Sequence, residues 1–288
     1  MDLLLLGHSG QLGWELQRTL QPLGVVVARD YPEVNMADPS SIRKSVQGCR
    51  PEVIVNATAY TDVDKAESEP ELAKAINGIG PGVLAEEARK LGAVLIHFST
   101  DYIFDGTKGA PYLETDLPNP LNVYGASKLF GEQAIQSVEG DHLIFRTAWV
   151  YSLRRECFVS KVLDWARKSE ILRVVDDQVS NPTWARMLAE ATAHVLTRGG
   201  DFLRERTGLY HLAGSGHASR YTWAQDILKF DPRKQEQRVK QLLPAQTSDF
   251  PTPAQRPLFS ALECKKFEQV FDLYLPAWST ALQMALAQ

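Results

Sequence analysis

The sequence predicts an α/β fold, a doubly wound parallel sheet with a smaller mixed α/β domain toward the C-terminus. Short, uniformly apolar runs alternate with longer amphipathic segments through the first 151 residues. Such alternation is typical of a parallel sheet that helices cover on both faces. After residue 151 this alternation of segments becomes irregular, which indicates a second structural unit packed on the first.

The composition limits the class of protein. A chain of 288 residues is long enough for one large domain or two interlocked domains. The net charge of -4 and the absence of a Lys/Arg-rich run argue against a nucleic-acid partner. No apolar run is long enough to span a membrane, and the first, residues 3–6, lacks the features of a signal peptide. Three scattered cysteines form no metal-spaced cluster or disulfide framework, so we expect a cytoplasmic protein.

The first half contains five predicted strands, at residues 3–6, 25–28, 53–57, 94–99 and 143–151. Helices are predicted between them at 11–20, 38–46 and 70–92. Asp38 is a suitable N-cap for the second helix, with Pro39 in its first turn. We expect Gly80 and Pro81 to break the third helix in its middle.

The second half is predicted to contain a helix at 158–169, a strand at 171–177, a helix at 184–196 and a strand at 208–214. Short helices and proline-rich loops follow. We therefore expect a dinucleotide-binding domain of residues 1–151 plus about 184–213. Residues from about 152 to 183 and 214 to 288 would form a substrate-binding cap.

A glycine-rich turn joins the first strand to the first helix. Gly7, Gly10 and Gly13 have the spacing G-x-x-G-x-x-G, with Gln11 and Leu12 between the last two. Glycines permit a tight turn and let a pyrophosphate approach the backbone amides at a helix N-terminus. The turn thus predicts a Rossmann-like cofactor site, although a plain strand-to-helix turn would also use glycine.

The second strand ends in two charged residues of opposite sign. Asp30 could accept hydrogen bonds from the ribose 2'-hydroxyl of NAD, and Arg29 could hold the 2'-phosphate of NADP. The sequence therefore leaves NADH and NADPH open as cofactors.

Polar residues also follow the third and fourth strands. Because the carboxyl ends of parallel strands line the ligand crevice of such sheets, we expect these side chains on its rim. The residues expected on the rim are Asn56, Ala57 and Ala59 after the third strand, and Ser99, Thr100, Asp101 and Tyr102 after the fourth.

Tyr124 and Lys128 lie four residues apart on the next predicted helix, and therefore on one face of it. A neighbouring ammonium should lower the pKa of the tyrosine from about 10 toward neutrality. We predict that Tyr124 is a general acid and that Thr100 hydrogen-bonds the same substrate oxygen. On its own the pair would more often be a solvated helix contact. His97 and His142 are expected to be core histidines.

Taken together, these motifs resemble the extended short-chain dehydrogenase/reductases, and among them the dTDP-4-dehydrorhamnose reductases. The matching segments run in order from residue 7 to 262: GHSGQLGWEL, VIVNATAYTDVDKAE, STDYIFDG, PYLETDLPNPLNVYGASKLFGE, RTAWVY, DDQVSNPTWA, YHLAGSG and TSDFPTPAQRPLFSAL. The resemblance implies hydride transfer from NADPH or NADH to the C4 ketone of dTDP-4-dehydro-L-rhamnose. It also implies that Lys128 holds the nicotinamide ribose and that Trp149 packs on the substrate.

The candidate site residues fall into three groups. The catalytic candidates are Tyr124, Lys128 and Thr100. The cofactor-binding candidates are Gly7, Gly10, Gln11, Leu12, Gly13, Asp30, Arg29, Asp38, Ala57, Ala59, Tyr60, Thr61 and Lys128. The substrate-binding candidates are Thr100, Asp101, Tyr102, Trp149 and Arg256, whose planar fork suits a nucleotide diphosphate. Asp101 is instead a turn cap in a second interpretation, Trp149 a core aromatic, and Arg256 a surface arginine.

The chain departs from the family pattern at Cys157 and Met187, where asparagine and aspartate are usual. Glu15 and Glu190 match two glutamates that bridge magnesium-linked dimers in some members, but the last helix offers no carboxylate. We therefore expect no metal, and a monomer or a homodimer. Two alternative functions stay open. One is another nucleotide-sugar reductase or epimerase. The other is a non-catalytic regulatory subunit resembling the methionine adenosyltransferase beta subunit.

Overall fold

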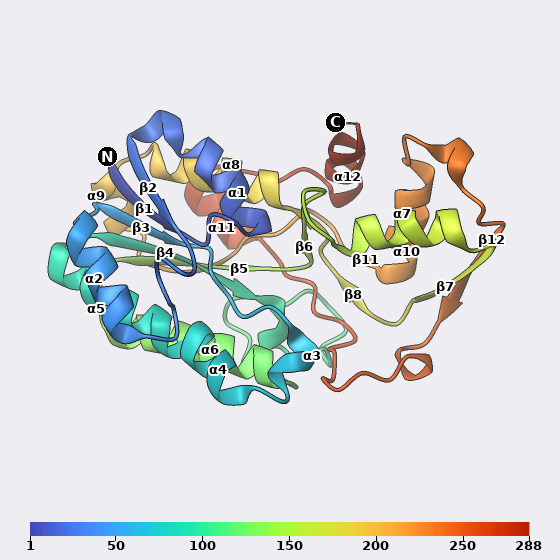
Figure 1. Ribbon diagram of the computed structural model, residues 1–288, viewed down its shortest axis with the longest axis horizontal. Helices are drawn as coiled ribbons and strands as arrows, with labels where there is room; N and C mark the ends of the chain where they lie inside the picture. Colours follow the sequence, from blue (N-terminus) through green and yellow to red (C-terminus); the bar gives the residue numbers. More distant parts are fainter. Residues whose placement is uncertain (288) are drawn as a thin grey trace.

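The computed structural model describes residues 1–287, and its centre is a six-stranded sheet in the order β10-β5-β4-β3-β1-β2 (Figure 1). All five neighbouring pairs are parallel. The strands are β1 (Asp2–Leu6), β2 (Val25–Arg29), β3 (Val53–Asn56), β4 (Val94–Thr100), β5 (His142–Thr147) and β10 (Gly208–His211). The predicted fold class is confirmed. Strand order reverses between β1 and β3, where such sheets bind ligands.

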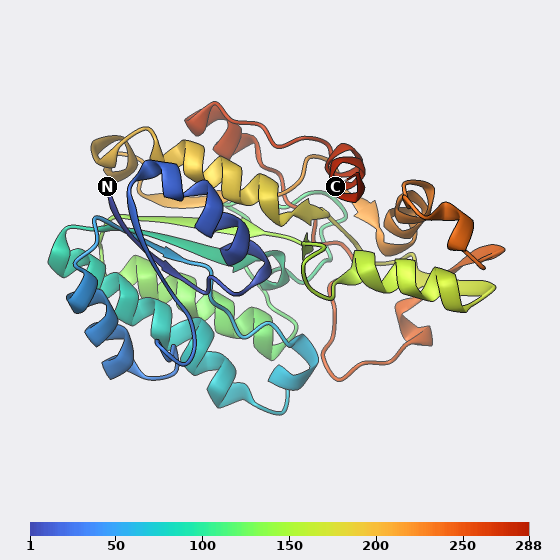
Figure 2. The same cartoon turned by 45° about the horizontal axis from the view of Figure 1, so that its top comes forward.

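Helices cover both faces of the sheet (Figure 2). Leu3 and Leu5 of β1 face a cluster with Leu16, and Leu4 faces a second cluster with Ile42, because successive strand residues point to opposite faces. The first face carries α1 (Gln11–Thr19), α8 (Ala185–Leu196), α9 (Gly200–Arg204) and α11 (Lys265–Phe271). The second carries α2 (Pro39–Cys49), α5 (Gly80–Leu91) and α6 (Val123–Ser137), with α3 (Val63–Ala66) and α4 (Pro70–Lys74) beside them.

The expected break at Gly80 and Pro81 is wrong. The chain stays helical from α4 through a π-helical turn, Ala75–Ile79, into α5. In that turn the Gly80 N–H donates to the Ala75 carbonyl, five residues earlier. Proline has no N–H to donate, and the wider turn before it accommodates that loss without a break.

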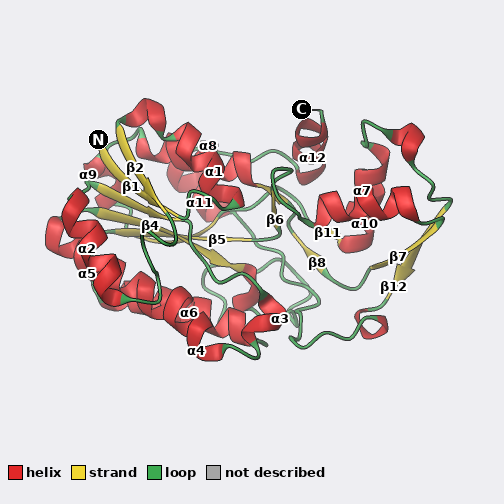
Figure 3. Ribbon diagram, viewed as in Figure 1, coloured by secondary structure: helices red, strands yellow, loops and turns green. Residues whose placement is uncertain are grey.

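A smaller unit lies beyond the carboxyl ends of the strands (Figure 3). It contains α7 (Phe158–Lys168), β7 (Ile171–Val175), α10 (Arg220–Lys229), β12 (Gln241–Ala245) and α12 (Trp278–Leu286), with the short strands β6 (Val150–Tyr151), β8 (Val179–Ser180), β9 (Thr183–Trp184) and β11 (Ala218–Ser219). Tyr151, Trp223 and Leu282 belong to its separate apolar core. The strand predicted at 143–151 is interrupted at Trp149, whose φ of 41° turns the chain from β5 into β6.

One segment of the predicted cap lies on the sheet instead. Phe267 and Phe271 of α11 pack in the first core cluster, and the ring centroid of Phe267 is 5.7 Å from that of Phe145 on β5. The chain therefore returns to the sheet once more before α12. Within residues 1–287, no helix is both long enough and apolar enough to cross a membrane.

Candidate active site

A cavity of about 780 Å³ opens where the strand order reverses, at the carboxyl ends of the strands. Its lining comes from the loops after β1, β2, β3, β4 and β5, and from α6 and the start of the cap. The residues are Gly7, Ser9, Gly10, Gln11, Leu12, Asp30, Tyr31, Val34, Asn35, Met36, Ala57, Thr58, Ala59, Thr61, Ile76, Phe98, Ser99, Thr100, Asp101, Tyr124, Lys128, Thr147, Trp149, Val150, Arg155 and Glu156. Most of the predicted site residues therefore meet in one place.

The glycine turn forms one end of this cavity. Gly7 has a φ of +83°, which favours glycine, and a Cβ on Gly13 would collide with the Gly7 carbonyl. Gly10 is the N-cap of α1 and no side chain caps the helix there. The first N–H groups of α1 are thus open to an anion, as a pyrophosphate cradle requires.

The two charged residues at the end of β2, Arg29 within the strand and Asp30 after it, differ in where their side chains lie. Asp30 lines the cavity and accepts from Ser9 Oγ at 2.6 Å and from the Tyr31 N–H at 2.8 Å. Arg29 does not line it, since its Nη1 lies 3.4 Å from Ser45 Oγ of α2. Asp38 is also outside the lining and caps α2, accepting from the Ser40 N–H at 2.8 Å.

After β3, Ala57, Ala59 and Thr61 line the cavity, as does Thr58, which the sequence did not single out. The Tyr60 side chain is not part of the lining, because its hydroxyl donates to Glu69 at 2.7 Å. Burial, together with this carboxylate, raises the pKa of Tyr60 to about 12.

Tyr124 and Thr100 line the cavity together, but the predicted direction of the tyrosine pKa is wrong. Burial raises the pKa of the Tyr124 phenol above its usual value of 10, and only a hydrogen bond with Thr100 opposes this. Lys128 Nζ instead donates to the Phe98 carbonyl at 2.6 Å and lies 3.1 Å from His97 Nε2. Burial lowers the pKa of Lys128 to about 8. A phenol that stays protonated at neutral pH is the form that a proton donor needs.

Three features hold α6 close to its neighbours. A Cβ on Gly125 would collide with the Tyr102 carbonyl, and one on Gly131 with the Asn77 carbonyl. Arg146 of β5 forms a buried bidentate ion pair with Glu132 of α6, with Nη2 2.6 Å from Oε2. The helix that carries Tyr124 and Lys128 is therefore fixed against both the sheet and the π-helical turn.

Of the substrate-binding candidates, Asp101 and Trp149 line the cavity. Asp101 Oδ2 accepts from Ser180 Oγ at 2.9 Å and also from Ser260 Oγ, so its carboxylate joins the sheet to the cap. Tyr102 and Arg256 lie outside the lining. The Tyr102 ring packs edge-on against Tyr124, at 5.9 Å between centroids.

The planar fork of Arg256 is already engaged. Its Nη1 and Nη2 lie 2.6 and 2.8 Å from the two carboxylate oxygens of Asp64. Another arginine, Arg220 at the start of α10, has no carboxylate within ion-pair distance among residues 1–287. Its guanidinium lies 3.7 Å from the centre of the Trp149 ring, which itself stacks on Trp223. The sequence reasoning missed Arg220, because no motif surrounds it.

The two glutamates considered for a metal lie on adjacent helices, α1 and α8. Glu15 is buried and pairs with Arg186, Oε2 to Nε at 3.3 Å, whereas Glu190 is exposed. No group of three potential metal ligands occurs in the described part of the chain. The expectation of a metal-free protein stays a prediction.

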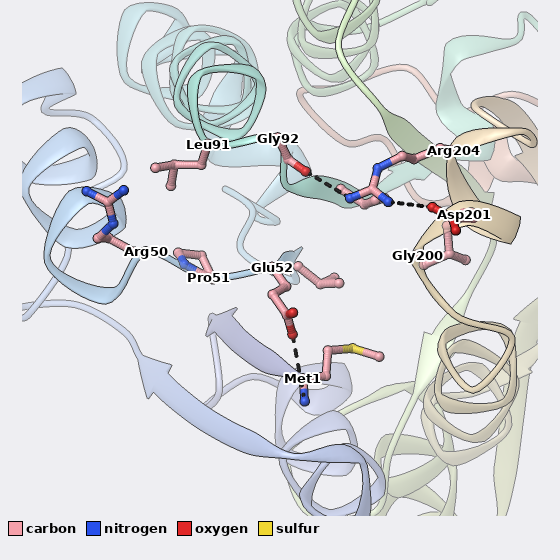
Figure 4. Close-up of a pocket in the computed structure, with 12 residues that line it drawn as sticks. Met1, Arg50, Pro51, Glu52, Leu91, Gly92, Gly200, Asp201 and Arg204 are labelled. Atoms are coloured by element: carbon pink, nitrogen blue, oxygen red, sulfur yellow. Dashed lines mark hydrogen bonds and ion pairs between the residues drawn. The ribbon is translucent and has the colours of Figure 1, made fainter.

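A second cavity of about 500 Å³ lies at the opposite, amino ends of the strands (Figure 4). Several of its charged groups pair with one another or with the backbone. Arg204 donates to Asp201 and to the Gly92 carbonyl, and the Met1 amino group faces Glu52. None of the predicted site residues lines it.

Comparison with known proteins agrees with this geometry. The family model of the RmlD substrate binding domain matches residues 1–288. The chain is 43% identical to a dTDP-4-dehydrorhamnose reductase of Escherichia coli K12, over 99% of this chain and 97% of that one. It is 40% identical to one of Burkholderia thailandensis, over 99% and 98%. The structure is similar to that of dTDP-4-dehydrorhamnose reductase from Bacillus anthracis in complex with NADP, with a TM-score of 0.90 at 31% identity over 99% and 98% of the two chains. The chain therefore belongs to the RmlD family of dTDP-4-dehydrorhamnose reductases.

Proposed function

We propose that the protein is an NAD(P)H-dependent reductase that converts dTDP-4-dehydro-L-rhamnose to dTDP-L-rhamnose, a precursor of cell-surface polysaccharide. The observation that carries this proposal is the meeting of Tyr124, Thr100 and Lys128 in one cavity with the glycine turn. Relatives named as dTDP-4-dehydrorhamnose reductases across nearly the whole chain support the choice of substrate.

The residues of the site suit the cofactor. The start of α1 at Gly10, where no side chain caps the helix, leaves its first backbone N–H groups open to a pyrophosphate. We propose that Gly7, Gly10, Gln11 and Leu12 hold the diphosphate, with Ala57, Ala59 and Thr61 beside the adenosine and Lys128 at the nicotinamide ribose. When bound, the reduced nicotinamide supplies the hydride that reaches the C4 carbon of the sugar.

Tyr124 and Thr100 act on the oxygen of the same carbonyl group. As the carbonyl carbon accepts the hydride, its oxygen gains negative charge. Hydroxyl donors already positioned in a site without bulk water stabilise that charge. Tyr124 then transfers its phenolic proton to the oxygen, and the phenolate that remains is stabilised by the Lys128 ammonium.

We propose that the substrate lies between the sheet and the cap. Trp149 offers a ring face to it, and Asp101 and Tyr102 border its sugar. The Arg220 guanidinium lies against the Trp149 ring with no carboxylate partner among residues 1–287, and it suits a phosphate group, since Arg256 is held by Asp64. Arg256 would stabilise this wall of the site through Asp64 rather than bind the diphosphate alone.

The test is the variant Tyr124→Phe, assayed by absorbance of the reduced nicotinamide with dTDP-4-dehydro-L-rhamnose. Loss of the general acid should lower kcat by about 10²- to 10⁴-fold, while cofactor binding survives. Tyr210→Phe is the control, because that hydroxyl donates to the Arg206 carbonyl away from the cavity. Unchanged turnover in Tyr124→Phe would contradict the mechanism. Net oxidation of the cofactor by the wild type separates a reductase from an epimerase.

We further propose a cytoplasmic location, which suits three cysteines that are all free. As a partner we propose only the nucleotide-sugar substrate, with a second copy of the chain if the protein is a homodimer.

A further inference from the structure

Asn56, at the end of β3, is a buried amide whose orientation is fixed by its neighbour. Its Oδ1 is the acceptor for the Thr58 backbone N–H at 3.1 Å and for Thr58 Oγ at 2.5 Å. A backbone N–H can only donate, so the oxygen of the amide must be on this side. The amide nitrogen of Asn56 therefore points the other way, to His97 Nδ1 at 3.0 Å.

This orientation determines the tautomer of His97, which is completely buried on β4. The Asn56 amide nitrogen can only donate, so His97 Nδ1 has to accept and carries no proton. The single N–H of a neutral imidazole is then on Nε2. Burial and the neighbouring Lys128 hold the pKa of His97 well below its usual value, which keeps the ring neutral.

His97 Nε2 faces Lys128 Nζ at 3.1 Å. Two donors cannot share one hydrogen bond, and an Nε2–H group opposite an ammonium would be such a pair. The contact is a hydrogen bond only when Nζ is an uncharged amine that accepts with its lone pair. Such an amine can still donate to the Phe98 carbonyl at 2.6 Å, as Lys128 does.

We propose that His97 is a positioning residue that holds Lys128 only in its uncharged form, so that the ammonium has to turn from His97 toward the cavity. The neutral amine rests between His97 and Phe98. Once protonated, Lys128 keeps its bond to the Phe98 carbonyl and presents its remaining N–H groups to the cavity that it lines with Tyr124. Asn56 acts indirectly, because it fixes the tautomer of His97.

The other groups around the pair do not supply this function. Glu132 on α6 favours the Lys128 ammonium, but it is already paired with Arg146 of β5. Tyr124 is a neutral phenol at neutral pH, and Asp101 accepts from hydroxyl groups of the cap. The side chains of β3 and of the π-helical turn that face this region, Asn56 and Asn77, are neutral amides.

The direct test is the histidine tautomer, read from two-bond ¹⁵N–¹H correlations in the ¹⁵N-labelled full-length protein. The His97 signal is identified by its loss in His97→Gln. We expect the Nε2–H tautomer, with Nδ1 in the range of an unprotonated nitrogen. A His97 ring protonated at Nδ1, alone or together with Nε2, would overturn the proposal. The tautomer itself is read in the wild-type protein, and where His97→Gln fails to fold, sequential triple-resonance assignment of the wild type identifies the His97 signal.

The second test is the pH profile of kcat, which rests on the proposed function. Phenolate stabilisation needs the ammonium, so activity should fall as the pH rises through the pKa of Lys128. In Asn56→Asp the carboxylate accepts a hydrogen bond from His97 Nδ1–H, so Nε2 carries no proton and can accept from the ammonium. His97→Gln can offer an amide oxygen to the ammonium without adding charge. In each variant the alkaline limb of the kcat profile should shift to higher pH by about one unit.

His142→Gln is the matched control, because His142 bonds to the Gly140 carbonyl and does not touch Lys128. Its alkaline limb should stay where it is in the wild type. If both variants fold and lose activity without a move of the limb, His97 has a structural role only and the proposal fails. An Nε2–H tautomer in a protein without reductase activity would count against the proposed function alone.

Discussion

At the scale of single residues, Asp101 places a buried carboxyl group where the sheet and the cap meet. Burial raises the pKa of its carboxyl to about 6, although Ser260, Ser180 and Thr100 all donate to it. A folded-state pKa above the unfolded one, about 4, means that folding favours the protonated form. The stability that this group contributes is complete below pH 4 and is lost as the pH rises through about 6.

We therefore predict that the stability of Asp101→Asn increases relative to that of the wild type as the pH rises. The free energy of unfolding of the variant minus that of the wild type should increase by on the order of 2 to 3 kcal/mol between pH 4 and pH 7. Urea unfolding at a series of pH values measures this. Asp201→Asn, at an almost fully exposed side chain, should show no such trend. A constant difference across the range would contradict the predicted linkage.

Asp30 is the residue expected to decide between the two cofactors, because its carboxylate lines the cavity and Arg29 does not. A carboxylate accepts from the ribose 2'-hydroxyl of NADH and repels the 2'-phosphate of NADPH. Asp30→Asn should lower the ratio of kcat/KM for NADH to that for NADPH roughly tenfold, about 1.4 kcal/mol. Arg29→Gln should leave the ratio near its wild-type value. Parallel assays with both cofactors decide, and the reverse pattern would assign selectivity to Arg29.

At the scale of elements, the position of α6 depends on small residues and on one ion pair. Gly131 lets the helix touch the π-helical turn at the Asn77 carbonyl, and Glu132 joins it to Arg146 of β5. Because Tyr124 and Lys128 are on the same helix, any displacement of α6 moves both relative to Thr100 on β4.

Gly131→Ala should accordingly reduce both stability and turnover. A Cβ that collides with a backbone carbonyl costs about 1 to 3 kcal/mol, and the shift it forces should lower kcat. Gly48→Ala is the matched control, since it is an exposed helical glycine of α2 with open space around it. The free energy of unfolding of that variant should increase by roughly 0.5 to 1 kcal/mol, and its activity should be unchanged. Thermal unfolding and steady-state kinetics test both, and wild-type kcat in Gly131→Ala would refute the argument.

At the scale of the whole molecule, the arrangement of Glu15 bears on assembly. Its buried carboxylate faces Arg186 and, at 3.9 Å, Arg154, so positive charge already surrounds the position where a divalent cation would bind. We predict that EDTA and added magnesium leave both kcat and the sedimentation coefficient unchanged. Sedimentation velocity with and without chelator measures the sedimentation coefficient. A fall from dimer to monomer on addition of EDTA would show a metal-bridged dimer and contradict the prediction.

Much of the fold was predictable because it depends on local patterns. The apolar runs of β1 to β4 and the amphipathic α1 and α8 agree with the predicted elements to within a few residues. The break at Pro81 was wrong, since a π-helical turn is set by the packing of α6 against Asn77 and leaves no sequence signal. The position of α11 under the sheet depends on Phe267 and Phe271, which resemble any other apolar pair in the sequence.

For the site, spacing predicted which residues would meet but not their electrostatic state. The Tyr124 pKa moved opposite to expectation, because burial has the larger effect and Lys128 is directed to Phe98 and His97. Lys128 and His97 are far apart in sequence, so their contact requires the register of β4 against α6. Arg220 was missed for the same reason, since its aromatic neighbour Trp149 lies in another segment of the chain.

The late return of the chain to the sheet has a consequence for folding during synthesis. Strands β1 to β5 are complete once residue 147 has left the ribosome, but the edge strand β10 ends at residue 211 and α11 at residue 271. Until β10 has been made, one edge of β5 is unpaired, and until α11 has been made, Phe145 lacks its cover of Phe267 and Phe271. Truncated chains that stop near residue 260 should therefore expose apolar surface and aggregate, because the last structural piece of the cofactor domain is made after most of the cap.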